Sequence, residues 1–178
     1  MGTIINVNYT ASANNELFGV FTLSFHGVDG LLHSVDIKFD PKQLWEFSRD
    51  TTSVAFDFLI LSLIIYNVDR AVNRLQCSSE GWRRQLKLAD VPVINLEAMN
   101  RGREAFNRAI SFLTGDDWEI NFVQALPYQY NPGKNVRQFS IQQYEKVALF
   151  SGGLDSLIGF IDEASTLQGD GRILLISH

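Results

Sequence analysis

The chain has 178 residues, of which 46% are hydrophobic and 20% are charged, a composition typical of one globular domain or slightly more. Its formal net charge of -5 argues against broad electrostatic binding to nucleic acid, so small molecules and proteins are the expected partners. The single cysteine, Cys77, permits no internal disulfide. The N-terminus lacks a signal-peptide pattern, and the longest apolar run, residues 58–66, is too short to span a membrane, so we expect a cytoplasmic location.

The first part of the chain predicts a sheet. Apolar and polar residues alternate over residues 4–9, 20–25 and 34–39, which predicts three strands of an antiparallel sheet. His26 and His33 flank the second turn. No third residue of suitable type and spacing accompanies them, so we interpret them as solvated turn histidines and not as metal ligands.

Two helices are predicted next. The Asp-Pro pair at residues 40–41 favours a short helix over residues 42–49. Thr or Ser within residues 51–53 can then cap a long helix that runs to about Leu75. Apolar residues recur in it at helical spacing, so we expect it to pack on the sheet as the main core helix. Its predicted inner face comprises Phe56, Leu59, Ile60, Leu63, Ile64, Asn67, Val68 and Ala71.

Charged residues at the far end of this helix leave two interpretations open. Asp69, Arg70 and Arg74 can form a structural ion pair, which we favour because polar groups near a core need partners, or they can contact a ligand. The sequence does not decide whether these arginines, or Arg83 and Arg84 further on, face a ligand or solvent.

A strand, a helix and a second strand follow. Residues 82–88 predict an amphipathic strand, Asp90 a turn, and residues 118–123 a further strand. Between them, residues 96–113 predict a helix with Gly115 as its C-cap. The helical period places Phe106, Ala109, Ile110 and Leu113 inward and Arg101, Arg103 and Arg108 outward, on a face that we interpret as solvated.

The amino-acid composition changes after residue 123, and this change predicts a domain boundary. Residues 124–143 are rich in Gln, Asn, Pro and Gly and have no sustained period. The aromatic residues Tyr128, Tyr130 and Phe139 indicate that this stretch lies against a surface. We therefore predict an N-terminal α+β domain over residues 1–123, a linker over residues 124–146, and the start of an α/β domain over residues 147–178.

The clearest functional motif is Ser151-Gly152-Gly153-Leu154-Asp155-Ser156. An apolar run precedes it and an apolar-periodic stretch follows it, which predicts a strand, a tight loop and a helix. Two glycines let successive N–H groups converge at the helix start, in a concavity that binds phosphate. The Asp155 carboxylate can hold Mg²⁺ near phosphates, and the Ser156 hydroxyl can hydrogen-bond a phosphate oxygen. The alternative is a turn that only caps a helix.

This motif is neither a Walker A loop nor a dinucleotide-binding fingerprint. Its pattern S-G-G-x-D-S resembles the PP-loop of the ATP pyrophosphatase superfamily, whose members split ATP between its α- and β-phosphates to adenylate a substrate. The resemblance implies that residues 151–156 grip the pyrophosphate end of ATP, with Mg²⁺ at Asp155 and with Asp155 and Ser156 in catalytic roles. His178 follows the second predicted strand of this part, at the edge where α/β sheets bind ligands, so it is a candidate nucleotide contact.

Four stretches together resemble the QueC-like proteins of bacterial antiphage defence operons, of the QatC type: IYNVDRAV at 65–72, FLTGDDW at 112–118, LFSGGLDS at 149–156 and LLISH at 174–178. The resemblance implies an α+β domain before a Rossmann-like PP-loop domain related to 7-cyano-7-deazaguanine synthase. It also implies ATP-dependent activation of a deazaguanine-type carboxylate for transfer to ammonia or to a partner protein from the same operon.

Two alternatives remain at this point. The N-terminal part can be a protein-docking module of a defence complex, or the chain can be a PP-loop ligase or tRNA-modifying enzyme of another branch. Residues 147–178 supply one β-α-β unit, smaller than a core that sustains itself. We therefore expect the chain to be a fragment that depends on further chain or a partner and cannot complete adenylation by itself.

Overall fold

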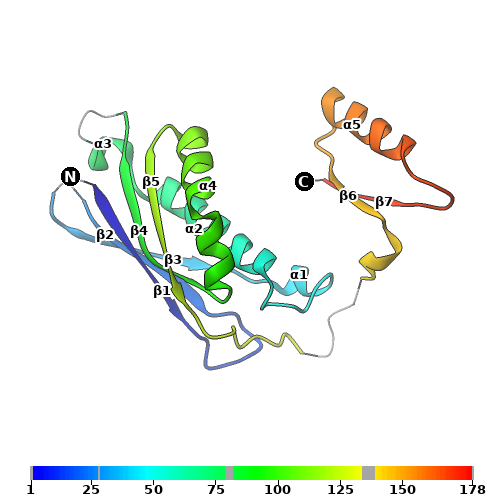
Figure 1. Cartoon of the computed structure of the whole chain (residues 1–178). Coiled ribbons are helices and arrows are strands. Elements are labelled where there is room, and N and C mark those ends of the chain that lie inside the picture. The colour runs from blue at the N-terminus through cyan, green and yellow to red at the C-terminus, as the bar shows by residue number, and fades with distance from the viewer. Residues whose placement is uncertain (1, 28, 79–81, 134–138, 178) are drawn as a thin grey trace.

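The computed structural model describes residues 2–27, 29–78, 82–133 and 139–177 and has a mixed α/β fold, as predicted (Figure 1). Two separate sheets are present in the described residues. We call residues 2–133 the N-terminal unit, because its strands and helices share one hydrophobic core. Its sheet contains β1 (Thr3–Thr10), β2 (Val20–His26), β3 (Leu32–Lys38), β4 (Gln85–Val93) and β5 (Asp117–Gln124).

The sheet of the N-terminal unit is mixed. Its strand order is β3-β2-β1-β4-β5, with antiparallel pairs between β1, β2 and β3. The prediction of an antiparallel sheet is confirmed for these three strands, but it does not hold for the whole sheet, because β4 adds to β1 and β5 adds to β4, both in parallel. The physical reason is the connection: each of these strands follows a helix that carries the chain back along the sheet, and such crossovers produce parallel pairs.

Strand β4 runs through the position where a turn was expected. Asp90 has a positive φ of 58°, and the register against β5 shifts between Leu88 and Val91. Such a bulge adds a residue to one strand without ending it. Trp82, predicted as the start of this strand, lies outside it and is exposed.

The helices of the N-terminal unit cover one face of the sheet. Side chains on this face, such as Ile5, Phe21 and Leu88, are buried, whereas Asn6 and Thr22 point to the other face and are not. The longest helices are α2 and α4, which Figure 1 shows side by side, and α1 and α3 are single turns. The bounds are α1 (Lys42–Trp45), α2 (Val54–Ala71), α3 (Arg74–Cys77) and α4 (Leu96–Thr114).

The predicted core helix is confirmed but is shorter than expected. Ser53 caps α2, its Oγ accepting a hydrogen bond from the Phe56 N–H, and the helix ends at Ala71. Asn73 then caps α3 as a separate turn, because its side chain accepts the Leu75 N–H and diverts the backbone. The predicted helix over residues 42–49 likewise ends early, at Trp45.

Helix α4 has the predicted bounds within one residue, with Gly115 at φ 73° as its C-cap. Its inner face is rotated from the prediction, since Ala109 and Leu113 are exposed. Polar residues take the inner positions because β5 is an edge strand with unpaired N–H groups. Three α4 side chains accept hydrogen bonds from β5: Asn107 from Ile120 N, Ser111 from Trp118 N and Thr114 from Trp118 Nε1.

A buried ion-pair network joins α2, α3, β4 and the turn before β5. The Asp116 carboxylate is fully buried and accepts hydrogen bonds from the backbone N–H and the guanidinium of Arg84 and from the Arg74 guanidinium. Arg84, only 1% exposed, also pairs with Asp69 and donates to the carbonyls of Asp69 and Val72 at the end of α2. The favoured structural interpretation is confirmed for Asp69 and Arg74, and the structure decides the open case of Arg84, which is buried in the same network.

The aromatic residues of the predicted linker lie against a surface, as expected. Tyr128 and Tyr130 are buried in the core of the N-terminal unit, where the Tyr128 ring lies 4.9 Å from that of Tyr9. Phe139 donates its N–H to the Glu46 carbonyl and its ring lies 5.2 Å from that of Phe47. The first part of the segment predicted as a linker therefore packs on the N-terminal unit.

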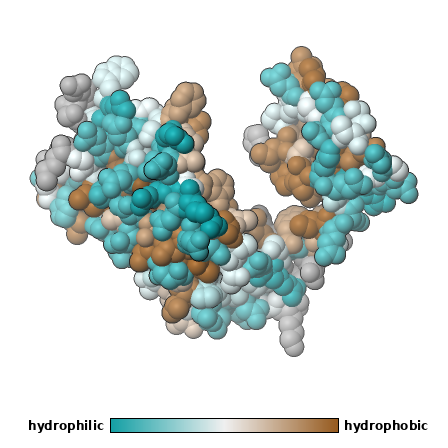
Figure 2. Space-filling model, viewed as in Figure 1, coloured by the Kyte–Doolittle hydropathy of each residue, from teal (hydrophilic) through white to brown (hydrophobic). Residues whose placement is uncertain are grey.

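The second sheet contains β6 (Lys146–Leu149) and β7 (Ile173–Ile176), which pair in parallel and are joined by α5 (Leu154–Ser165). A single 3₁₀ turn, η1 (Ile141–Gln143), precedes β6. Figure 1 shows this β6–α5–β7 unit apart from the five-stranded sheet, and Figure 2 shows apolar side chains on its surface. None of the described residues in this unit is buried, so it has no core of its own.

Candidate functional site

The predicted motif lies in the connection between β6 and α5. Phe150 N donates to the Ile176 carbonyl at 2.8 Å, which extends the parallel pairing to the end of both strands. The loop of residues 151–153 begins directly after this hydrogen bond, at the carboxyl edge of the sheet. This is the edge at which α/β sheets bind ligands. The predicted order of strand, tight loop and helix is confirmed.

The loop backbone needs glycine at one position in particular. Gly152 has φ 78°, a left-handed conformation that a side chain disfavours, although nothing lies within 4 Å of the space that a Cβ would occupy. Gly153 is the N-cap residue of α5 and has no side chain to accept the N–H groups of the first turn. These N–H groups can therefore donate to an anion that approaches the helix N-terminus.

Two serine hydroxyls lie at the rim of the loop. Ser156 Oγ donates to the Gly153 carbonyl at 2.8 Å, and Ser151 Oγ lies 3.3 Å from Ser156 Oγ. These contacts bring the first and last residues of the motif together, as phosphate recognition by both hydroxyls requires. A hydroxyl that donates to one oxygen retains lone pairs and can rotate, so both remain able to bind an anion.

Asp155 occupies the first turn of α5 and its side chain is exposed. The described residues contain no group of three or more His, Cys, Asp or Glu side chains that could hold a metal ion by themselves. Mg²⁺ commonly binds one or two carboxylates together with substrate phosphates and water. A single carboxylate beside a phosphate-binding loop therefore fits Mg²⁺ that arrives with a nucleotide, and it does not fit a permanent metal centre.

The other predicted site residues are placed as follows. Leu154 begins α5 and is exposed, and His178 lies outside the described residues. Lys146 of β6 was not a predicted site residue, and its Nζ contacts Glu163 and Thr166 Oγ1 at the other end of the unit. Lys146 therefore does not contribute positive charge to the loop, and the backbone N–H groups are the donors available there.

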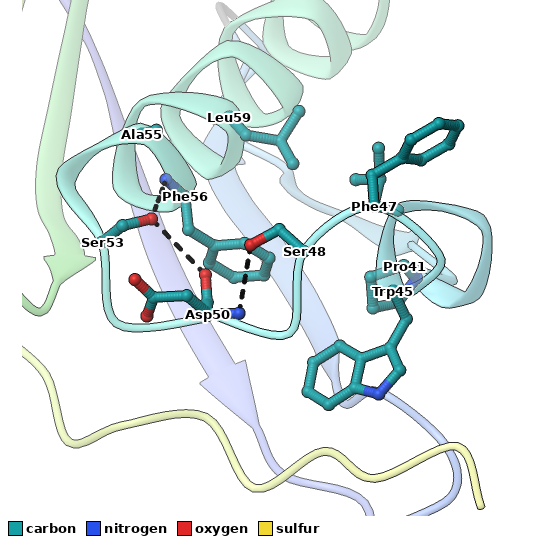
Figure 3. Close-up of a pocket in the computed structure, with 10 residues that line it drawn as sticks. Pro41, Trp45, Phe47, Ser48, Asp50, Ser53, Ala55, Phe56 and Leu59 are labelled. Atoms are coloured by element: carbon teal, nitrogen blue, oxygen red, sulfur yellow. Dashed lines mark hydrogen bonds between the residues drawn. The ribbon is translucent and has the colours of Figure 1, made fainter. Parts of the chain in front are cut away.

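A hollow lies elsewhere, between α1 and α2 (Figure 3). It has a volume of about 190 Å³ and mostly apolar walls that include Trp45, Phe47 and Phe56. Figure 3 shows its polar groups bonded to one another: Ser48 Oγ accepts the Asp50 N–H, and Ser53 Oγ donates to the Asp50 carbonyl. These groups shape the loop that begins α2, so we assign no site to this hollow.

Sequence analysis missed two buried carboxylates, Asp57 and Asp116. Asp57 lies within α2 and accepts the N–H groups of Ile94 and Asn95, which fixes the start of α4. The helical spacing of the sequence could have revealed Asp57, because it places this aspartate among the inward-facing apolar residues. A buried carboxylate requires hydrogen-bond partners, so such a position indicates a structural contact. His26 is the exposed last residue of β2, whereas His33 lies within β3, is partly buried and stacks on Phe25, so it is not a turn histidine.

No protein-family model, no curated protein and no solved structure matches this chain. In the described residues, no helix is both long enough and apolar enough to cross a membrane.

Proposed function

We propose that the chain carries the ATP-binding loop of a PP-loop ATP pyrophosphatase, and that this protein is a QueC-like enzyme of an antiviral defence system. It would adenylate a carboxylate of the deazaguanine type for transfer to ammonia or to a protein partner. The observation that carries the proposal is the left-handed Gly152 between a parallel strand and an uncapped helix N-terminus, within the motif S-G-G-x-D-S.

The loop geometry supports the binding of a polyphosphate. The first-turn N–H groups of α5 donate to phosphate oxygens, and the helix dipole adds partial positive charge at the same place. The hydroxyls of Ser151 and Ser156 lie together at the rim and bind further oxygens. Asp155 is exposed in the same turn and would hold Mg²⁺, which supplies positive charge next to the phosphates when bound.

In the proposed reaction, an oxygen of the substrate carboxylate attacks the α-phosphorus of ATP. A bond forms between this oxygen and the α-phosphorus, the bond from the α-phosphorus to the bridging oxygen breaks, and pyrophosphate leaves with the electron pair. The loop N–H groups and the two hydroxyls stabilise the charge that develops on the leaving pyrophosphate. Their positions in the loop and in the first turn of α5 would hold the pyrophosphate in line with the attacking oxygen.

Nucleotide binding is tested with variants of three glycines. Gly152→Ala places a Cβ on a left-handed residue in the loop and is expected to weaken ATP binding about tenfold or more, measured by calorimetry with Mg²⁺ and a non-hydrolysable ATP analogue. Two variants are controls. Gly159→Ala adds a methyl group in open space within α5, at a residue with an ordinary helical φ. Gly169→Ala adds one at a residue with a left-handed φ that is far from the loop. If all three variants bind equally, the loop is not the ATP site.

The reaction class is tested by its products. The intact protein, supplied with ATP and a deazaguanine carboxylate, is expected to release AMP and pyrophosphate, and Asp155→Asn is expected to abolish this release. The formation of ADP and phosphate would contradict the proposal, because the proposed reaction breaks the bond between the α-phosphorus and the bridging oxygen and leaves the β- and γ-phosphates joined.

A further inference from the structure

The two edges of the five-stranded sheet differ in how their backbone groups are satisfied. The edge strands are β5 and β3. At the β5 edge, side chains of α4 accept backbone N–H groups: the Ile120 N–H donates to Asn107, and the Trp118 N–H donates to Ser111. An edge without such partners can pair with a strand from another chain, so the backbone groups of β3 decide whether this edge is open.

The pairing of β3 with β2 shows which of its backbone groups point outward. The Gly27 N–H donates to the Leu31 carbonyl at 3.0 Å, and opposite residues of an antiparallel pair alternate between bonded and non-bonded. The bonded positions of β3 are therefore 33, 35 and 37. The N–H and C=O groups of the intervening residues, 32, 34, 36 and 38, point away from β2. Within the described ranges, no other segment hydrogen-bonds to these groups, so the β3 edge is open.

The side chains of this edge are complementary to themselves. Ile37 is buried on the core face, and Val35 and Phe39 are partly buried against the same core. Asp36 and Lys38 are exposed and belong to the opposite face of the sheet. When two identical strands pair in antiparallel fashion, opposite charges two residues apart can lie opposite each other, and such cross-strand pairs stabilise a sheet.

We propose that β3 pairs in antiparallel fashion with β3 of a second copy of the chain, with Ile37 opposite Ile37 of the second copy. In this register Asp36 of each copy lies opposite Lys38 of the other, and the two residues form an ion pair. Both residues have outward backbone groups, so each such pair also exchanges two backbone hydrogen bonds. Val35 lies opposite Phe39 of the second copy, which continues the apolar layer of the sheet across the interface.

The charges select this register from its neighbours. A slip of the second copy by one residue is excluded, because it would oppose an outward backbone group to one that is bonded within its own sheet. Centring the pair on Asp36 or on Lys38 places like charges directly opposite each other, which is destabilising. Centring it on Val35 places Asp36 opposite Ser34 of the second copy and forms no ion pair.

The expected dimer is a reversible one. A single strand pair buries less area than the roughly 1,200–2,000 Å² of a standard stable interface, so we expect association at micromolar concentrations of the chain. The net charge of -5 on each copy opposes association at long range, but salt at physiological strength screens charges more than about 8 Å apart. The dimer does not depend on ATP binding, because β3 belongs to the N-terminal unit.

The proposal is tested by exchanging the two charges in separate variants of the whole chain. Sedimentation velocity over a series of concentrations is expected to show a dimer of the unchanged chain. Asp36→Lys places lysines opposite each other, Lys38→Asp places aspartates opposite each other, and each variant alone is expected to associate about tenfold or more weakly. An equal mixture of the two variants is expected to recover the dimer, because every pair across the interface then joins opposite charges.

A control variant and a second measurement separate this edge from general effects. Glu104→Lys changes the net charge by the same amount as Asp36→Lys at an exposed position of α4, and it is expected to leave association unchanged. Hydrogen exchange resolved by residue reports the register. The N–H groups of Asp36 and Lys38 are expected to gain protection as the chain concentration rises, whereas that of Leu32, which lies beyond the paired residues, is not.

Each other result overturns the proposal. A chain that is monomeric at every concentration leaves the β3 edge to a strand of another protein. A mixture of the two charge variants that stays monomeric excludes the ion pairs between Asp36 and Lys38. A dimer that Leu149→Ser dissociates and the charge variants do not belongs to the β6–α5–β7 unit. ATP binding should be unchanged in the variants of β3, which keeps this test separate from that of the loop.

Discussion

The two units of this chain differ in how they hold their shape. In the described residues, every buried side chain belongs to the N-terminal unit, whereas the β6–α5–β7 unit has none. The motif with the clearest chemistry therefore lies on the unit with the least internal support. The unit with the well-formed core carries the buried ion-pair network instead.

The difference follows from the amount of apolar surface that each unit can cover. Parallel sheets are normally covered on both faces, and a two-stranded sheet is only marginally stable by itself. In the β6–α5–β7 unit, one helix covers two strands, and side chains such as Val147, Leu149 and Ile176 are exposed. The local conformation of the loop is thus specified by its own residues, while its rigidity depends on contacts outside this unit.

The largest expected effect comes from the ion-pair network. Asp116→Ala leaves Arg84 buried without its main partner and is expected to destabilise the N-terminal unit by about 3–5 kcal/mol. The measurement is urea unfolding followed by tryptophan fluorescence, which reports this unit alone because all three tryptophans belong to it. The control is Arg83→Ala, which breaks an exposed pair with Asp117 and should cost at most about 1 kcal/mol. Equal losses in the two variants would show that Asp116 is not a buried anchor.

The difference in packing between the two units is tested by substituting one helical isoleucine in each unit. Ile60→Ala in α2 empties a fully buried site and is expected to cost about 2–5 kcal/mol of unfolding free energy. Ile158→Ala in α5 removes a side chain that is half exposed and should cost less than about 1 kcal/mol. Hydrogen exchange resolved by peptide is the readout for α5. A large loss of protection in α5 with Ile158→Ala would reveal packing that the described contacts lack.

A smaller effect is expected where α2 meets the start of α4. Asp57→Ala removes the acceptor of the Ile94 and Asn95 N–H groups and should cost about 1–3 kcal/mol, because these donors then lose their partner. Asp155→Ala is the matched control, since this aspartate also lies in the first turn of a helix but is exposed. If hydrogen exchange near residue 94 is unchanged in Asp57→Ala, the carboxylate does not anchor α4.

The smallest effect near neutral pH comes from the titration of Asp116 in the N-terminal unit. Burial favours the neutral form of Asp116, but the hydrogen bonds and charges of Arg84 and Arg74 outweigh it and lower the pKa of this carboxyl. Its contribution to stability is therefore present above about pH 4, the ordinary value, and is lost as the pH falls further.

At alkaline pH the sign is reversed. Burial, with the hydrogen bond to Asp40, raises the pKa of Tyr130 to about 12, and burial also raises the pKa of Tyr128. The folded state keeps these phenolic protons, so stability should fall as the pH rises above about 10. The free energy of unfolding, measured in urea at a series of pH values, checks both the acidic and the alkaline loss of stability. Tyr130→Phe should reduce the alkaline loss, whereas Tyr66→Phe, at an exposed tyrosine, should not.

Local features were predicted well because neighbouring residues decide them. Ser53 caps α2 and Gly115 ends α4, as the cap patterns indicated. The motif loop was also predicted correctly, since the two glycines, of which Gly152 takes the left-handed φ, stand between a strand pattern and a helix pattern. The roles of Asp155 and Ser156 remain predictions, because a conformation that suits a phosphate does not establish which phosphate binds.

Features that depend on distant partners were predicted less well. The inner face of α4 was misplaced because Ser111 and Thr114 turn toward the unpaired edge of β5, a strand that the helical period does not reveal. In the sequence Arg84 stands in a polar, basic stretch, yet it is the largest fully buried side chain among the described residues.

The sequence by itself determined the caps at Ser53 and Gly115, most of the strand and helix positions, and the conformation of the loop at residues 151–156, because these depend on backbone preferences and on residues a few positions apart. Only the tertiary structure decided that β4 and β5 pair in parallel, that Asp116 collects two arginines from distant segments, and that Leu113 and Phe112 face outward. The physical reason is burial: which polar groups must find partners, and which apolar side chains stay uncovered, is settled only when the elements pack against one another.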